Sequence, residues 1–138
     1  MMLQPEVPSP DEVTADWWEH TKHHRFMIQQ CQNCQHFQHP PRAVCTECSS
    51  MNHLELVEAS GRGEVDTFTV VYRAPRAEID VPYTLARVRL TEGPILLTQL
   101  LGNEAWVIGD PVQVDWVEVP DGRALPIFRK LDDSNRHI

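Results

Sequence analysis

Two Cys-x-x-Cys pairs constrain this chain more than any other feature of its sequence. Cys31 and Cys34 form the first pair, and Cys45 and Cys48 form the second pair after ten intervening residues. Each pair can turn two sulfurs toward one centre, and the two pairs together supply the four thiolates of a tetrahedral zinc site. Because four protein ligands leave no open position for water or substrate, we expect this site to be structural.

Three other uses of the cysteines compete with zinc. A rubredoxin-type iron site has the same ligands at similar spacing, so the spacing leaves iron open. A thioredoxin-like redox motif needs one Cys-x-x-Cys at a helix start between strands, which this pattern does not offer. Disulfide frameworks normally accompany a signal peptide, and residues 1–10 lack the layout of one. The neighbouring His36, His39 and His53 are expected to be solvated loop residues.

Length and charge limit the remaining possibilities. The 138 residues suffice for one domain, or for two small modules of which one is held together by metal. Twelve Lys and Arg against 20 Asp and Glu give a formal charge of −8, which is unfavourable for gripping nucleic-acid phosphates. No apolar run approaches the roughly 20 residues that a membrane helix needs. We therefore expect a cytoplasmic protein that binds neither membrane nor nucleic acid.

The N-terminal part, residues 1–25, is predicted to be a leader followed by a helix. In the sequence Ser9-Pro10-Asp11-Glu12, Ser9 can cap the helix, Pro10 suits its first turn and Glu12 completes a capping box. The apolar stripe of this helix is narrow and includes Trp17 and Trp18. We expect one tryptophan to pack on the protein and the other to be exposed as a partner anchor; the alternative is that both lie in the core.

Residues 26–60 are predicted to form a zinc ribbon. Strands at 26–30 and 54–58 flank the cysteines and can pair across the metal site. A ribbon of this size buries little apolar surface, so metal binding would supply the folding free energy that its small core cannot provide.

Residues 61–130 alternate like a series of strands, and 131–138 read as a flexible tail. The predicted strands cover residues 64–72, 83–90, 95–101, 112–119 and 124–129. In the first of them, Val65, Thr67, Thr69 and Val71 should share one face. Five antiparallel strands without a long helix between them suggest an OB-type barrel, with an SH3-like barrel or an open meander as alternatives. The longest connection, 73–81, is the place to look for contacts.

The same order of elements resembles a family of small proteins that join a rubredoxin-like zinc ribbon to an OB-fold and accompany thiolase-like acyl-CoA enzymes. The resemblance is carried, in one order along the chain, by Cys31, Cys34, Pro40-Pro41-Arg42, Cys45, Cys48, Ser60-Gly61-Arg62-Gly63, Phe68-Thr69-Val70-Val71, Pro82-Tyr83, Glu92-Gly93-Pro94, Gly109, Pro111-Val112, Asp121-Gly122, Leu125-Pro126 and Phe128. Two positions depart from the family pattern. Gln35 stands where a glycine of positive φ is frequent, and Thr46 stands where proline is frequent.

The resemblance implies a mainly β fold with an N-terminal helix, a four-cysteine rubredoxin-like zinc ribbon and a five-stranded OB-fold barrel. It also implies a non-catalytic subunit that accompanies a thiolase, hydroxymethylglutaryl-CoA synthase, acyltransferase or sterol side-chain aldolase protein. Zinc would be the structural cofactor, and the CoA ester would be a ligand shared with the partner. Two copies on a partner dimer would be the simplest assembly.

Two other classes of function remain as alternatives. Zinc ribbons and OB-folds also occur in nucleic-acid-binding modules, but the only lysines are Lys22 and Lys130 and no strand carries a basic stripe. A stand-alone enzyme would need a nucleophile or base in context, and the sequence has neither Gly-x-Ser-x-Gly nor a phosphate loop. The cluster His20, His23 and His24 lacks a carboxylate at fixed spacing and resembles a solvated helix end. We therefore predict no catalytic residue.

Arginine suits the phosphates of CoA, because its guanidinium pairs with them in bidentate geometry. The candidates in loops and turns are Arg42, Arg62, Arg73 and Arg76. For Arg42 and Arg62 we favour a structural role at the junction of ribbon and barrel, and no arginine is assigned to CoA from sequence.

Overall fold

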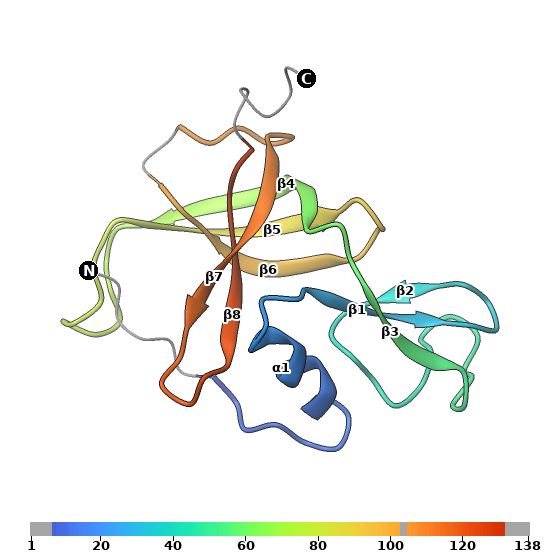
Figure 1. Cartoon of the computed structure of the whole chain (residues 1–138). Helices are drawn as coiled ribbons and strands as arrows, with labels where there is room; N and C mark the ends of the chain where they lie inside the picture. The colour runs from blue at the N-terminus through green and yellow to red at the C-terminus, as the bar shows by residue number, and fades with distance from the viewer. Residues whose placement is uncertain (1–6, 103–104, 132–138) are drawn as a thin grey trace.

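The computed structural model describes residues 7–102 and 105–131, and it places one helix and eight strands within them (Figure 1). The predicted leader (1–6) and most of the predicted tail (132–138) lie outside the described residues. The elements, in chain order, are α1 (Ala15–Thr21), β1 (Met27–Cys31), β2 (Phe37–Gln38), β3 (Leu54–Glu58), β4 (Arg62–Val71), β5 (Tyr83–Leu90), β6 (Ile95–Leu100), β7 (Pro111–Glu118) and β8 (Ala124–Lys130). Within these residues, no helix has the length and apolar character needed to cross a membrane.

Strands β4 to β8 close into a barrel in the order β4-β5-β6-β8-β7. The OB-type barrel predicted from the sequence is confirmed, and the five predicted strands agree with the observed ones to within two residues. One pairing differs from the expected all-antiparallel arrangement. Strands β6 and β8 meet in parallel at Leu100 and Phe128, where the barrel closes.

A shift of register in β4 changes which side chains face the barrel interior. The pairing of β4 with β5 slips between Val65 and Thr67, as a β-bulge does. Val65 is buried, whereas Thr67 and Thr69 are exposed and Phe68 and Val70 turn inward. The predicted common face for Val65 and the two threonines is therefore wrong, because the extra residue reverses the alternation.

The helix begins later than the sequence pattern predicts. Its N-cap position is Thr14, and the turn before it is held by Asp11, whose Oδ1 accepts hydrogen bonds from the amides of Val13 (2.9 Å) and Thr14 (2.8 Å). These bonds lower the pKa of the Asp11 carboxyl. The predicted capping role of Ser9 is wrong, because the helix begins at Ala15 and its N-cap position is Thr14, well past Ser9.

Trp17 and Trp18 are both buried, each 7% exposed, so the expectation that one of them is exposed is wrong. Figure 1 shows the reason: α1 lies in the corner between the ribbon and the barrel, which offers the helix two surfaces to cover. Trp17 donates from Nε1 to the carbonyl of Met27 in β1 at 2.7 Å. Trp18 lies under the guanidinium of Arg123, the residue just before β8, which is 4.7 Å from the Trp18 ring centroid.

The ribbon and the barrel share one hydrophobic core. The residues before and within β1, Phe26 to Ile28, are almost completely buried together with barrel residues. The Phe26 ring lies 6.1 Å from that of Phe128 in an edge-to-face arrangement. His39 also faces this core, 5.5 Å from the Trp17 ring and 5.9 Å from Phe26. Its predicted place in a solvated loop is therefore wrong, and burial lowers its pKa to about 4.

Candidate metal centre and barrel pocket

The structure brings the four cysteine sulfurs into one cluster. All four Sγ atoms lie within 4.8 Å of one another, with Cys31 and Cys48 3.7 Å apart and Cys34 and Cys45 3.6 Å apart. Metal–sulfur bonds of about 2.3 Å in a tetrahedron hold sulfurs about 3.8 Å apart, so the donor set fits a tetrahedral ion. The cysteines are free, which excludes the disulfide alternative.

Two similar turns aim the sulfurs. In the first turn the amide of Gln35 donates to the Cys31 carbonyl at 2.7 Å, and in the second turn the amide of Ser49 donates to the Cys45 carbonyl at 3.0 Å. Gln35 has φ 69° and Ser49 has φ 67°. The expected positive φ at Gln35 is confirmed, and Ser49 is an equivalent position that the sequence analysis missed. Cys31 and Cys45 are buried, whereas Cys34 and Cys48 are exposed.

The sulfur cluster cannot hold four negative charges without a cation, because like charges at this spacing oppose one another's ionisation. The side chain of Asn33 lies 3.6 Å from the sulfur of Cys48, and this contact is the main reason why the pKa of Cys48 falls to about 6. The amide of His36 favours the Cys34 thiolate, but partial desolvation and the sulfurs of Cys48, Cys45 and Cys31 raise the pKa of Cys34 to about 12. A divalent cation would remove this competition and stabilise all four thiolates.

Two buried glutamines connect the cysteine turns to the ribbon strands. Gln38 donates from Nε2 to Oε1 of Gln29 at 2.6 Å and to the carbonyl of Val44 at 3.2 Å, and its Oε1 accepts from the amide of Thr46 at 2.9 Å. Gln29 in turn bonds both backbone groups of Arg42, each at 2.9 Å. These contacts fix the connection between the pairs. Sequence reasoning missed them, because a glutamine in a short strand carries no pattern that distinguishes it from a surface residue.

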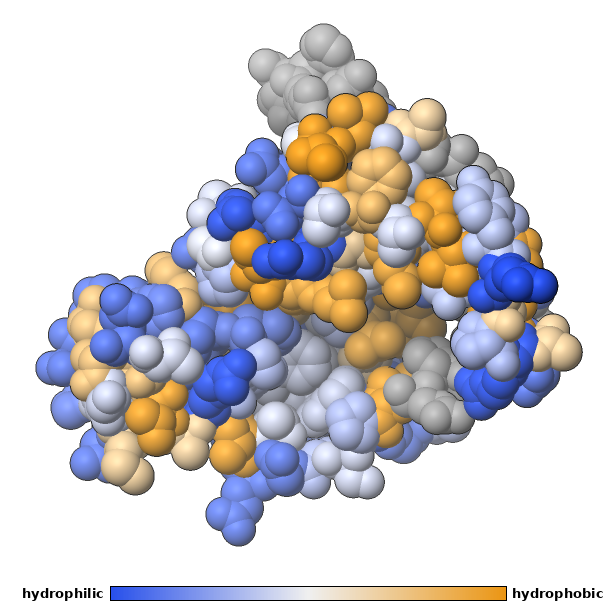
Figure 2. Space-filling view, turned by 180° about the vertical axis from the view of Figure 1, so that it is seen from behind, coloured by the Kyte–Doolittle hydropathy of each residue, from blue (hydrophilic) through white to orange (hydrophobic). Residues whose placement is uncertain are grey.

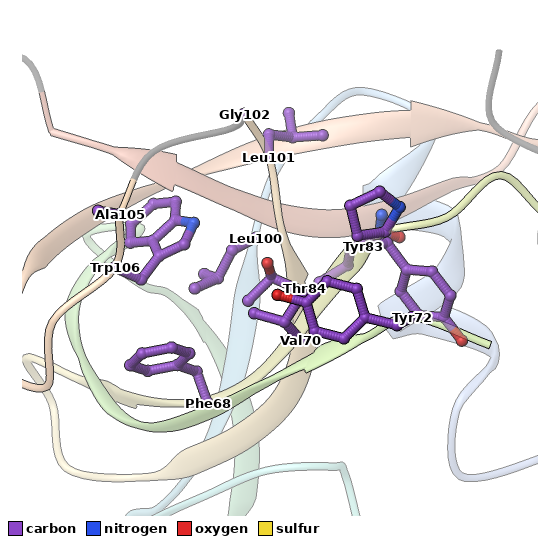
Figure 3. A pocket seen from close by; sticks show the side chains of 12 residues that line it. Phe68, Val70, Tyr72, Tyr83, Thr84, Leu100, Leu101, Gly102, Ala105 and Trp106 are labelled. Atoms are coloured by element: carbon purple, nitrogen blue, oxygen red, sulfur yellow. The ribbon is translucent and has the colours of Figure 1, made fainter. Parts of the chain in front are cut away.

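A pocket of about 630 Å³ opens at one end of the barrel (Figure 3). Its walls combine aromatic and aliphatic side chains with polar groups, and are formed by Phe68, Val70, Tyr72, Pro82, Tyr83, Thr84, Gln99, Leu100, Leu101, Gly102, Ala105 and Trp106. Trp106 is 7% exposed, and its buried indole Nε1 has no hydrogen-bond partner among the described residues. The sequence analysis pointed to the 73–81 loop near this pocket but did not identify the pocket or Trp106.

A second recess, of about 540 Å³, lies between the ribbon and the turn that joins β5 to β6. His36, Arg42 and Glu92 are among the residues that line it. The structure holds Arg42 and Arg62 through backbone groups: Gln29 bonds Arg42, and the Arg62 carbonyl accepts from the Thr91 amide at 3.0 Å. These bonds hold the backbone of both residues near the junction of ribbon and barrel, and no bond from either guanidinium to a carbonyl is seen among the described residues.

The remaining arginine and histidine candidates lie apart from the metal cluster. Arg73 and Arg76 stand in the loop between β4 and β5, and both are exposed.

His24 pairs with the carboxylate of Glu118 and stacks on Trp116, with ring centroids 5.2 Å apart. The sequence analysis missed this carboxylate, because Glu118 is 94 residues away along the chain. The pair is exposed, so it resembles a surface ion pair more than a catalytic dyad.

Family models match both parts of the chain. Residues 18–53 match the rubredoxin-like zinc ribbon domain of ChsH2, and residues 56–117 match the C-terminal OB-fold domain of ChsH2. A DUF35 domain-containing scaffold protein of Pyrococcus furiosus is 36% identical over 109 residues, which cover 78% of this chain and 79% of that protein.

Similar proteins include subunits of larger enzymes. A probable enoyl-CoA hydratase alpha subunit of Thermomonospora curvata is 38% identical over 124 residues, which cover 88% of this chain. The chain spans only 39% of the length of that subunit. A solved structure described as Ltp2-ChsH2(DUF35) aldolase superposes with a TM-score of 0.80 at 37% identity, over 90% of this chain and 98% of the matched chain.

Proposed function

Because the chain belongs to the DUF35 family, whose members join a rubredoxin-like zinc ribbon to an OB-fold as ChsH2 does, we propose that it is a non-catalytic subunit of a thiolase-like acyl-CoA-processing complex. The observation that carries this proposal is the match to a chain of the solved structure described as Ltp2-ChsH2(DUF35) aldolase, over 98% of that chain. Relatives named as a hydratase alpha subunit and as scaffold proteins support the same role.

The metal in this proposal is zinc, held by Cys31, Cys34, Cys45 and Cys48. The sulfur spacing suits a tetrahedral ion, and the matching family domain is a zinc ribbon. Four thiolates close the coordination sphere, so the ion contributes folding energy and no Lewis-acid chemistry.

The barrel supplies the surface for the partner in this proposal. Figure 2 shows hydrophobic residues gathered over the barrel, whereas hydrophilic residues cover much of the ribbon. Leu97 in β6, and the adjacent Val107 and Ile108 in the loop before β7, are 61–73% exposed, and they are the apolar side chains that we propose the partner covers. A partner dimer would carry two copies of the chain in the simplest symmetric assembly.

The recess between ribbon and barrel is the proposed place for the phosphates of the CoA ester. Arg42 lines it with an exposed side chain, and His36 lies beside it. The backbone of Arg42 is fixed by Gln29, so the guanidinium extends from a defined position. This combination favours Arg42 over Arg73, which stands in an open loop.

Co-purification tests the proposal. The tagged chain, isolated from its native source at moderate salt, should bring a thiolase-like protein with it, identified by mass spectrometry. Light scattering of the purified complex should give equal numbers of the two chains. The isolated chain should turn over no acyl-CoA ester. Submicromolar binding to an oligonucleotide, with no acyl-CoA enzyme retained, would instead support a nucleic-acid-binding module.

A further inference from the structure

One buried hydrogen-bond donor at the barrel pocket, the indole N–H of Trp106, has no partner within residues 7–102 and 105–131. Indole N–H groups that are buried normally find an acceptor, because removing one from water without a hydrogen bond costs free energy. Trp106 is buried, yet its Nε1 lacks a partner among the described residues. Figure 3 shows the nitrogen-bearing edge of the Trp106 ring turned toward the other side chains of the pocket.

The position of Trp106 is fixed by the segment that follows it. The amide of Val107 donates to Oδ2 of Asp110 at 2.8 Å, and the amide of Gly109 donates to the carbonyl of Val65 in β4 at 2.7 Å. Lys130 of β8 lies 3.6 Å from the Asp110 carboxylate and 5.8 Å from the centroid of the Trp106 ring. Contacts with β4 and β8 therefore hold the indole of Trp106 in place. Its N–H lacks a partner among the described residues although the ring itself is well supported.

The walls of the pocket suit a ring-sized apolar molecule. Phe68, Tyr83 and Trp106 offer aromatic surface, and Leu100 and Val70 offer aliphatic surface. A volume of about 630 Å³ is within the range that protein pockets for small molecules occupy. An apolar occupant without a hydrogen-bond acceptor would leave the Trp106 N–H with neither a ligand acceptor nor water as a partner. The geometry therefore favours an occupant that carries an acceptor.

We propose that the barrel pocket binds an apolar, ring-sized small molecule through a hydrogen bond from Trp106 Nε1 to a carbonyl or other acceptor of that molecule. No covalent step is involved. Resting on the proposed function, we take the natural occupant to be the apolar part of the acyl group of the CoA ester. The apolar walls would hold the body of the ligand, and the indole donor would select ligands by the position of their acceptor.

A matched pair of probes tests this proposal. 2-Acetylnaphthalene carries a ketone, and 2-ethylnaphthalene has nearly the same shape without an acceptor. The chain has four tryptophans, so a ¹⁵N-labelled sample gives at most four indole N–H signals, and Trp106→Phe identifies the one from Trp106. We expect the ketone to move that signal downfield and to bind at least about threefold more tightly than the hydrocarbon.

Trp106→Phe keeps an aromatic wall and removes the donor, so the two probes should then bind equally. Trp116→Phe, a tryptophan change beside His24 and away from the pocket residues, should leave the preference for the ketone intact. Equal binding of the two probes to the unaltered protein would overturn the proposal. It would also be overturned if neither probe binds and the Trp106 signal moves only when a partner protein is added, because the pocket would then receive a partner side chain. Failure to capture any acyl-CoA enzyme would refute the proposed function and leave these binding results untouched.

Discussion

The side chain of Gln38 donates a hydrogen bond of 2.6 Å to the side chain of Gln29, its direct neighbour across the β1–β2 pair. Both glutamines are buried, at 5% and 7% exposure. Through them four backbone groups of the connection between the cysteine pairs are bonded to the strands: the amide and carbonyl of Arg42, the carbonyl of Val44 and the amide of Thr46. The cysteine sulfurs are thus held by a polar network as well as by their own turns.

Gln38→Met keeps the length of the side chain and removes these hydrogen bonds. The amide of Thr46 and the carbonyl of Val44 would lose their bonds to Gln38, and each lost bond of this kind costs on the order of 1 kcal/mol or more. We expect zinc affinity, measured by competition with a chromophoric chelator, to fall about tenfold. Gln32→Met, at an exposed position in the first cysteine turn, should leave the affinity unchanged. Equal losses in both variants would mean that the buried network does not position the sulfurs.

The metal itself should stabilise the cysteine turns more than the barrel. Cys45→Ser removes a buried ligand, so elemental analysis should find less than one zinc per chain. Amide hydrogen exchange should then accelerate by at least tenfold between residues 31 and 53. Strands β4 to β8 should keep their protection, because their core is hydrophobic and contains no sulfur ligand. Loss of protection throughout the barrel would show that the ribbon and barrel unfold as one unit.

Positive φ at the two cysteine turns predicts which glycine substitutions are favourable. Ser49 has φ 67°, where an L-residue costs on the order of 1 kcal/mol relative to glycine. Ser49→Gly should therefore raise the free energy of unfolding by about 0.5–1 kcal/mol in denaturant titrations. Gln35→Gly should gain less, because it also removes the bond from Gln35 Nε2 to the Gln32 carbonyl. Glu47→Gly, at a position without positive φ, should lower stability.

The proposed partner surface can be tested on two adjacent side chains. Val107 and Ile108 are 61% and 65% exposed, so changing both to serine should alter the stability of the isolated chain little. Loss of two apolar contacts in an interface should weaken co-elution with the acyl-CoA enzyme about tenfold or more. Met51→Ser, an equally exposed apolar residue on the ribbon, is the matched control. If Met51→Ser weakens the complex and the double variant does not, the ribbon is the docking surface.

Local patterns in the sequence predicted the parts of this fold that depend on local spacing. The Cys-x-x-Cys turns bring their sulfurs together because each turn is short, and the barrel strands alternate in a way that reveals their bounds. The bulge at Val65 and Thr67 was not predictable in this way, because one extra residue leaves no mark in the composition of a strand.

Residues at the junction of ribbon and barrel could not be placed from sequence. The narrow apolar stripe of the helix predicts a buried place for one of Trp17 and Trp18, but α1 covers two surfaces that belong to different parts of the chain. Trp106 follows β6 without a periodic pattern, so nothing marked it as a pocket residue. These positions depend on how distant segments pack, which a single sequence does not encode in its local periodicity.

Histidine 39 is the last of these junction residues, and its burial predicts a pH dependence of stability. Its Nδ1 is buried without a hydrogen-bond partner among the described residues, and its ring faces Trp17 and Phe26. Burial disfavours the charged imidazolium, so the pKa of His39 falls from 6.5 to about 4.

At pH values between these two pKa values of His39, the unfolded chain binds a proton that the folded chain does not bind. The contribution of His39 to stability is therefore complete above pH 6.5 and is lost as the pH falls toward 4, by on the order of 2–3 kcal/mol. Because metal affinity itself depends on pH, the measurement must be a difference between variants. In denaturant titrations from pH 7.5 to 4.5, His39→Phe should lose less stability on acidification than the unaltered protein, whereas His23→Phe, at an exposed position, should lose as much. Parallel curves for His39→Phe and the unaltered protein would show that His39 is charged in the folded state or is not buried there.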